Sequence, residues 1–164
     1  MISLNNLELM LNRVHDWIKA ADQKVSIFLA FQGVVLAILF SNFSSRELTD
    51  ILILSYLEFV LLMLSVILFS LSVYKSISAI IPRLTKDKSQ RSLTYFGDIA
   101  QFEFNKYSDI LKTANNSIYR SDLIDQIYIS SKICTYKHAE FSDAIISFIL
   151  AIILLFADWI VIKM

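Results

Sequence analysis

The residue types that carry out most enzymatic chemistry are scarce in this chain. Its 164 residues include two histidines, His15 and His138, and one cysteine, Cys134. His15 and Asp16 are adjacent, as in some metal phosphohydrolases, but no second histidine cluster completes such a site, and a surface pair on a helix explains them better. Cys134 has no base beside it, which favours a small buried residue. Because no nucleophile, base and orienting group occur together, we expect no enzyme, no cofactor and no metal site.

A second set of residues has the chemistry that a nucleotide pocket requires. Aromatic rings can stack on a base, and lysine or arginine side chains can hold a phosphate. Residues of these kinds flank the apolar segments of the chain: Asp22 and Lys24, Arg83 and Arg91, Tyr95-Phe96-Gly97 with Asp98, and Lys132 with Lys137. The alternative is that these charges are solvated anchors at the ends of membrane spans. Spacing alone favours that alternative.

Two acids, Glu58 and Asp158, lie inside apolar runs. A charge at the middle of a bilayer costs roughly 2.5–3.5 kcal/mol on insertion scales, less near an interface, and such residues usually face a cavity or a partner. One interpretation is that Asp158 reaches the interface and Glu58 bonds a neighbouring serine or tyrosine. The other is that both acids line the mouth of a pore formed on oligomerisation.

The composition indicates long helices that position these groups. The chain is 56% hydrophobic and contains only 2 Gly and 1 Pro, whereas turn-rich folds need many such residues. Its net charge of zero does not suggest a nucleic-acid binder. Its single cysteine excludes an intramolecular disulfide.

Residues 51–81 form the longest apolar run, interrupted only by the charges of Glu58 and Lys75 and followed by Pro82, the single proline. About 20 apolar residues in a helix cross a bilayer, and proline ends a helix. We predict a transmembrane helix over 51–74. A loop at 42–50, predicted to be external, precedes it, with Thr49 or Asp50 as helix cap.

The N-terminal segment has apolar residues at alternating spacings of three and four. They are Leu4, Leu7, Leu11, Val14, Ile18, Ala21 and Val25. This stripe predicts a bundle-forming helix over 1–24 that continues as a first span over 25–41, where Gly33 would let a neighbouring helix approach. The alternative divides 3–41 into two segments, one of them lying on the membrane surface.

Residues 75–142 form an insert between the second span and a third span at 143–162. Alternating apolar spacing predicts an amphipathic helix over about 99–114, with Asp98 as its N-cap, and Asn115-Asn116-Ser117 predicts a turn. A last helix is expected from about 121 to 142, continuing into the third span, with Leu123, Ile127 and Cys134 on one side.

These segments predict an all-α membrane protein with three transmembrane helices, long helical cytoplasmic extensions and one extra cytoplasmic amphipathic helix. With the N-terminus and the insert inside, every basic residue except Arg46 and Lys163 is cytoplasmic, as the positive-inside rule requires.

Three segments extend the argument: HDWIKAADQKVSIFLAFQGVVLAI at 15–38, YFGDIA at 95–100 and DLIDQIYISSKICTYK at 122–137. Together, in order and over nearly the whole chain, they resemble the transmembrane effector family of the bacterial Pycsar antiphage system. The first segment departs slightly from the family pattern, because Val25 replaces a small residue.

The resemblance implies an effector of the bacterial inner membrane that cyclic UMP or cyclic CMP activates on phage infection. The effector then disrupts the membrane, and infection aborts. The matched residues implied in sensing are Asp22, Lys24, Tyr95, Phe96, Gly97, Asp98, Asp122, Gln126, Lys132 and Lys137. On this hypothesis lysines meet the phosphate, an aromatic ring stacks on the pyrimidine, and Gln126 reads the base edge. The alternative is that Asp22, Lys24 and Asp98 form structural salt bridges and caps.

The partners expected are the lipid bilayer, a cyclic pyrimidine mononucleotide and further copies of the chain, with no nucleic acid. Two other functions remain open from the residues themselves. A membrane scaffold would dock another protein through its heptad stripes, and a holin-like pore would be toxic on expression alone.

Overall fold

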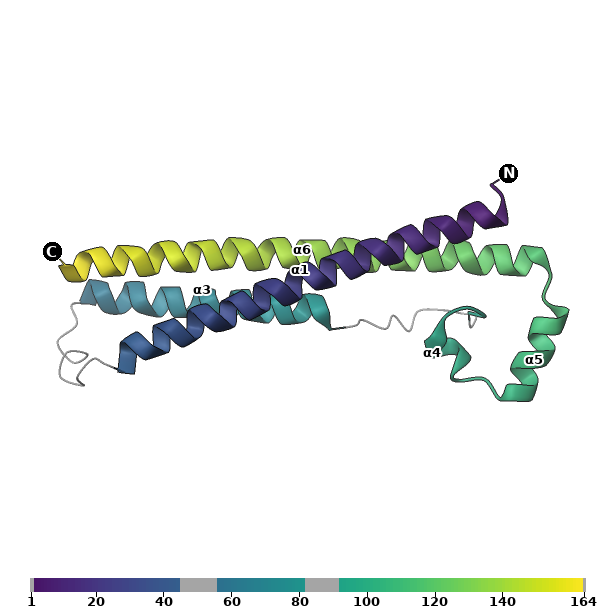
Figure 1. The fold of residues 1–164 in the computed structure, drawn as a ribbon, viewed down its shortest axis with the longest axis horizontal. Coiled ribbons are helices and arrows are strands. Elements are labelled where there is room, and N and C mark those ends of the chain that lie inside the picture. The colour runs from purple at the N-terminus through teal and green to yellow at the C-terminus, as the bar shows by residue number, and fades with distance from the viewer. Residues whose placement is uncertain (1, 45–55, 82–91, 164) are drawn as a thin grey trace. The chain divides into compact units, whose positions relative to one another are not determined.

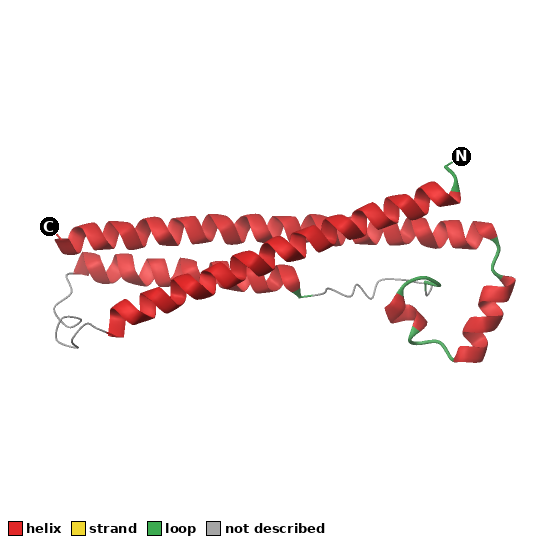
Figure 2. Ribbon diagram, in the orientation of Figure 1, coloured by secondary structure: helices red, strands yellow, loops and turns green. Residues whose placement is uncertain are grey.

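A computed structural model describes residues 2–44, 56–81 and 92–163, and all regular structure in those ranges is α-helical (Figures 1 and 2). The helices are α1 (Leu4–Ser44), α3 (Tyr56–Ile80), α4 (Phe96–Ile99), α5 (Phe104–Thr113) and α6 (Asn116–Lys163). The prediction of an all-α chain is therefore confirmed. The predictions that concern Arg46, the caps at Thr49 and Asp50, Pro82, Arg83 and Arg91 lie outside the described residues.

Three of these helices, α1, α3 and α6, are long and apolar enough to cross a membrane. This confirms the prediction of three helices able to span a membrane. α1 is a single helix of 41 residues, so residues 3–41 do not divide into two segments as the alternative required. α6 has 48 residues and likewise runs without a break from the insert through residues 143–162.

The chain divides into two compact units. The short-helix unit comprises Met1–Ala20 and Pro82–Thr135, and the three-helix unit comprises Ala21–Ile81 and Tyr136–Met164. Both α1 and α6 contribute residues to each unit.

In the three-helix unit, parts of α1, α3 and α6 lie side by side (Figure 1). The Phe148 ring of α6 makes edge contacts with Phe28 and Phe31 of α1, at centroid distances of 5.3 and 5.7 Å. Phe69 of α3 completes this cluster, 5.9 Å from Phe148. The aromatic cluster thus joins all three helices.

Apart from these aromatic side chains and Val25, the buried residues of this unit are small, polar or charged. The buried residues of these kinds are Ala21, Gln32, Ser65, Ser72, Ser76, Ala79, Lys137, Ala144, Ser147, Ala151 and Asp158. Many large apolar side chains are instead exposed, among them Ile27, Val34, Val66, Ile67, Ile149, Ile153 and Phe156. This distribution is typical of helices that pack in lipid, where small residues allow close approach and apolar side chains face the acyl chains.

Every seventh residue of α6 from Leu123 to Asp158 is buried. This seam corrects the predicted stripe of Leu123, Ile127 and Cys134. Leu123 and Cys134 are buried, but Ile127 is half-buried, and Gln126 and Ser130 lie on the buried face. The three apolar residues alone did not reveal the seam, because its other members are polar or small.

The insert differs from the prediction at its helix ends. α5 begins at Phe104 rather than at residue 99, and Asp98 lies within the separate short helix α4 instead of capping a longer one. α6 begins at Asn116 rather than at residue 121, within the predicted turn. The Oδ1 atom of Asn115 accepts hydrogen bonds from the backbone N–H groups of Ser117 and Ile118, at 3.1 and 3.0 Å, and so caps α6 early.

Candidate functional site

The residues predicted to sense a nucleotide divide between the two units. Tyr95, Phe96, Gly97, Asp98, Asp122, Gln126 and Lys132 lie in the short-helix unit. Asp22, Lys24 and Lys137 lie in the three-helix unit. We describe the two groups separately.

Asp122 of α6 holds the segment that precedes α4. Its Oδ2 atom accepts hydrogen bonds from the backbone N–H groups of Leu93 and Thr94, both at 3.1 Å, and from the Thr94 hydroxyl at 2.8 Å. A carboxylate satisfied by several donors fixes the backbone that carries those donors. Asp122 therefore fixes the position of the backbone that directly precedes Tyr95-Phe96-Gly97.

Asp98 closes the same segment from its other end. Its Oδ2 atom accepts a hydrogen bond from the backbone N–H of Ser92 at 2.8 Å, and the Ser92 hydroxyl accepts from the N–H of Tyr95 at 3.0 Å. The Tyr107 hydroxyl of α5 donates to the Leu93 carbonyl at 2.9 Å. Asp98 is thus part of an internal hydrogen-bond ring, which favours a structural role for this carboxylate.

The aromatic pair stands on this fixed segment. The rings of Tyr95 and Phe96 have centroids 4.8 Å apart, and the Phe96 residue is 73% exposed. The Tyr95 ring lies against Gly97, where an added Cβ would come within 2.7 Å of Tyr95 Cε1. Burial raises the pKa of Tyr95, and the charge of Asp98 raises it further, so its hydroxyl remains protonated. The exposed Phe96 ring offers a surface on which a base can stack.

Gln126 and Lys132 differ in their access to a ligand. Gln126 is 8% exposed, and among the described residues its Nε2 amide has no hydrogen-bond acceptor. Lys132 is exposed, with its Nζ atom 4.5 Å from the centroid of the Tyr128 ring. An unsatisfied buried amide is costly, so a group that brings an acceptor to Gln126 would gain a hydrogen bond.

In the three-helix unit the structure brings Asp22 and Lys137 together. Lys137 Nζ lies 2.5 Å from Asp22 Oδ1 and donates a second hydrogen bond to the Ala79 carbonyl of α3 at 2.8 Å. The Lys137 side chain is 7% exposed and that of Asp22 is 42% exposed. Lys24 is exposed, and no ion pair to it is found in the described part of the chain. Asp22 therefore forms an interhelical salt bridge, as the structural alternative proposed.

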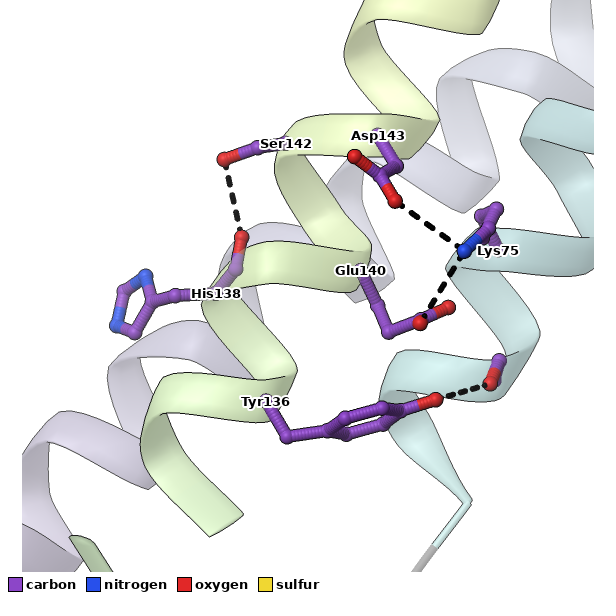
Figure 3. A network of polar contacts seen from close by, with 7 residues as sticks. Lys75, Tyr136, His138, Glu140, Ser142 and Asp143 are labelled. Carbon is purple, nitrogen blue, oxygen red and sulfur yellow. Dashed lines mark hydrogen bonds and ion pairs between the residues drawn. The ribbon is translucent and has the colours of Figure 1, made fainter. Parts of the chain in front are cut away.

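A neighbouring network was missed from the sequence. Lys75 Nζ of α3 lies 3.2 Å from Glu140 Oε1 and 3.2 Å from Asp143 Oδ2 of α6 (Figure 3). The hydroxyls of Ser78 and Tyr136 share a hydrogen bond at 3.0 Å, and the His138 imidazole points away from these groups (Figure 3). The charges at the ends of the apolar runs were the only available signal. The partners in this network lie more than 50 residues apart in the sequence, so the sequence alone did not indicate which charges pair.

The two acids predicted to line a pore both belong to the three-helix unit. Asp158 is 6% exposed, and Glu58 is half-buried in the first turn of α3. Their role in a pore stays a prediction. Among the residues that the structure describes, no group of three or more His, Cys, Asp or Glu side chains is placed to hold a metal ion.

Comparison with known proteins gives one finding. A family model described as the Pycsar effector protein domain matches residues 6–162. No curated protein and no solved structure matches the chain. The match covers α3, α4 and α5 completely, nearly all of α1 and α6, and all the residues in the two groups described above.

Proposed function

Because the chain belongs to the Pycsar effector family, we propose that cyclic UMP or cyclic CMP binds it and triggers disruption of the inner membrane and abortive infection. The observation that carries this proposal is the family match over residues 6–162, which includes three helices able to span a membrane. The effector acts without catalysis and needs no cofactor. A nucleotide shifts such a protein between two states only if it binds them with different affinity.

Both residue groups contain side chains that can recognise part of a cyclic nucleotide. Phe96, supported by Tyr95, stacks on the pyrimidine, because it is an exposed ring on a segment fixed by Asp98 and Asp122. The candidates for binding the phosphate are Lys132 in the short-helix unit and Lys137 and Lys24 in the three-helix unit. Gln126 reads the base edge with the amide that has no acceptor in the described structure.

We place the N-terminus and residues 75–142 on the cytoplasmic side of the inner membrane. The basic residues support this orientation, because only Arg46 and Lys163 are then external. A cytoplasmic insert has access to a nucleotide made inside the cell.

The effector acts as a homo-oligomer that associates through α1. Five small residues, Ser26, Ala30, Gly33, Ala37 and Ser41, follow one another at spacings of three and four, and all are exposed. An added Cβ at Gly33 meets no atom within 4 Å, so no other part of the described chain covers this position. Small residues in this pattern let two membrane helices approach closely. With Cys134→Ala as background, Ala37→Cys should cross-link two copies, and Gly33→Leu should prevent the cross-link.

Thermal unfolding of the detergent-purified protein tests nucleotide binding. A ligand at 100 times its Kd stabilises the protein by about 2.7 kcal/mol. We expect a shift with cyclic UMP or cyclic CMP and none with cyclic AMP or cyclic GMP. Phe96→Ala should remove the shift. Phe104→Ala should keep the shift, because Phe104 is even more exposed than Phe96 but lies at the start of α5.

Two other results would contradict the proposal. No shift with any of the four nucleotides, together with a soluble partner in pull-downs, would favour a scaffold. Toxicity on expression without any nucleotide would favour a holin-like pore.

A further inference from the structure

Lys137 is a buried ammonium group at a place where three helices meet. It projects from α6, and its two acceptors are the Asp22 carboxylate of α1 and the Ala79 carbonyl of α3. An ammonium group has three N–H donors, so these two acceptors use most of its hydrogen-bonding capacity. All three residues lie within the three-helix unit.

The two acceptors of Lys137 differ in how firmly they are held. Ala79 belongs to the last turn of α3, whose carbonyls have no partner within the helix and attract a positive charge. It is completely buried, and its carbonyl is part of the α3 backbone, so no side-chain rotation moves this acceptor away from Lys137. Asp22 is 42% exposed and is held by a side chain that can rotate into water. Asp22 is therefore the exchangeable partner.

The geometry points to Asp22 as a built-in competitor of the ligand phosphate, an inference that rests on the proposed function. In the resting protein the Asp22 carboxylate occupies Lys137. On binding, an oxygen of the phosphodiester takes its place on the same ammonium group. One singly charged oxygen anion replaces another, so Lys137 keeps its charge compensation throughout.

The exchange has a mechanical consequence for α1. The displaced Asp22 carboxylate becomes hydrated, which costs little because it is already partly exposed. Lys137 then links α6 to α3 and to the ligand but no longer to α1. The ligand favours the released state because only in that state is Lys137 available to it. The residue that binds the phosphate is thus also the residue that frees α1.

A carboxylate of the neighbouring Lys75 network provides a matched control for Asp22. Asp143, like Asp22, is a solvent-accessible carboxylate that pairs with a lysine of another helix. It lies 3.2 Å from Lys75 Nζ. Loss of Asp143 leaves Lys75 paired with Glu140, also at 3.2 Å. Asp143→Asn therefore removes a comparable interhelical charge pair without leaving a lysine unpaired.

The test is expression of Asp22→Asn in cells that lack the cyclase, with membrane potential and growth as readouts. We expect depolarisation and growth arrest without nucleotide, and neither effect with Asp143→Asn or with the charge-conserving Asp22→Glu. In detergent, removal of the competitor should tighten binding of the pyrimidine nucleotide by about tenfold. A purely structural salt bridge would instead give a less stable protein with weaker or unchanged binding.

The outcomes separate this inference from the proposed function. If the wild-type protein binds no nucleotide, the proposed function fails. If the wild-type protein responds, but Asp22→Asn is silent without nucleotide and binds it no more tightly, only the competition is overturned. If Asp22→Asn does not insert, Asp22→Ser is measured in the same way. Failure of both to insert also contradicts the inference, because a pair that a ligand opens cannot be indispensable for folding.

Discussion

Gln32 of α1 donates a hydrogen bond from Nε2 to the hydroxyl of Ser72 of α3 at 2.6 Å, and both side chains are buried. The Ser72 hydroxyl in turn donates to the Ala144 carbonyl of α6 at 2.6 Å. A single serine therefore connects all three helices of the three-helix unit. In lipid, where no water competes, such bonds determine which faces of the helices meet.

Replacement of Ser72 by alanine should loosen this unit. Ser72→Ala leaves the Gln32 amide and the Ala144 carbonyl without their shared partner, and we expect a loss of about 1 kcal/mol in the free energy of unfolding. Unfolding in detergent, followed by circular dichroism, measures this loss. Ser70→Ala is the control, because Ser70 is exposed on the same helix. Equal stability of the two variants would show that the Gln32–Ser72–Ala144 connection does not stabilise the unit.

Loss of the Asp122 carboxylate should release the segment before α4. Asp122→Ala removes three hydrogen bonds to one carboxylate oxygen, and we expect local opening of residues 92–98 to become easier by about 2 kcal/mol. Hydrogen exchange of the peptide that contains Leu93 and Thr94 reports this change. Asp125→Ala, at an exposed position one turn further along α6, should exchange as the wild type does. Unchanged exchange in Asp122→Ala would contradict the role assigned to this carboxylate.

The missing side chain at Gly97 should matter for ligand binding more than for folding. An alanine Cβ there would displace the Tyr95 ring, which can swing aside, so we expect the unfolding free energy to fall by no more than about 1 kcal/mol. The displaced ring no longer supports Phe96, and the stabilisation by the pyrimidine nucleotide should shrink. Gly33→Ala, where a Cβ meets nothing within 4 Å, should keep the full nucleotide-induced shift. A full shift in Gly97→Ala would exclude the aromatic pair from the binding surface.

The sequence predicted the helices better than their contacts. The α1 stripe was readable because Leu7, Val14, Ala21 and Val25 are apolar and all are buried. The corresponding seam of α6 was not readable, because Ser130, Lys137 and Asp158 look like solvent-facing residues. Periodicity reveals a buried face only where burial selects apolar side chains, and helices in lipid also bury small and polar ones.

Helix ends and residue pairs were predicted less well. The start of α6 depended on the Asn115 side chain, which can form a turn or a cap with the same atoms. Asp98 is a residue type that often caps a helix N-terminus. In the structure, however, its carboxylate accepts a hydrogen bond from the backbone N–H of Ser92. Asp22 and Lys137 were both selected by family resemblance. That they pair with each other, 115 residues apart, follows only from the three-dimensional arrangement.

We propose that a cyclic pyrimidine nucleotide makes this protein permeabilise a membrane. The most direct measurement uses liposomes that contain the purified protein and hold a potassium-diffusion potential, read with a potential-sensitive dye. We predict that cyclic UMP or cyclic CMP dissipates the potential, that cyclic AMP and cyclic GMP do not, and that liposomes without protein respond to none. A potential that persists with every nucleotide, in liposomes where the protein is shown to be inserted, would contradict the account.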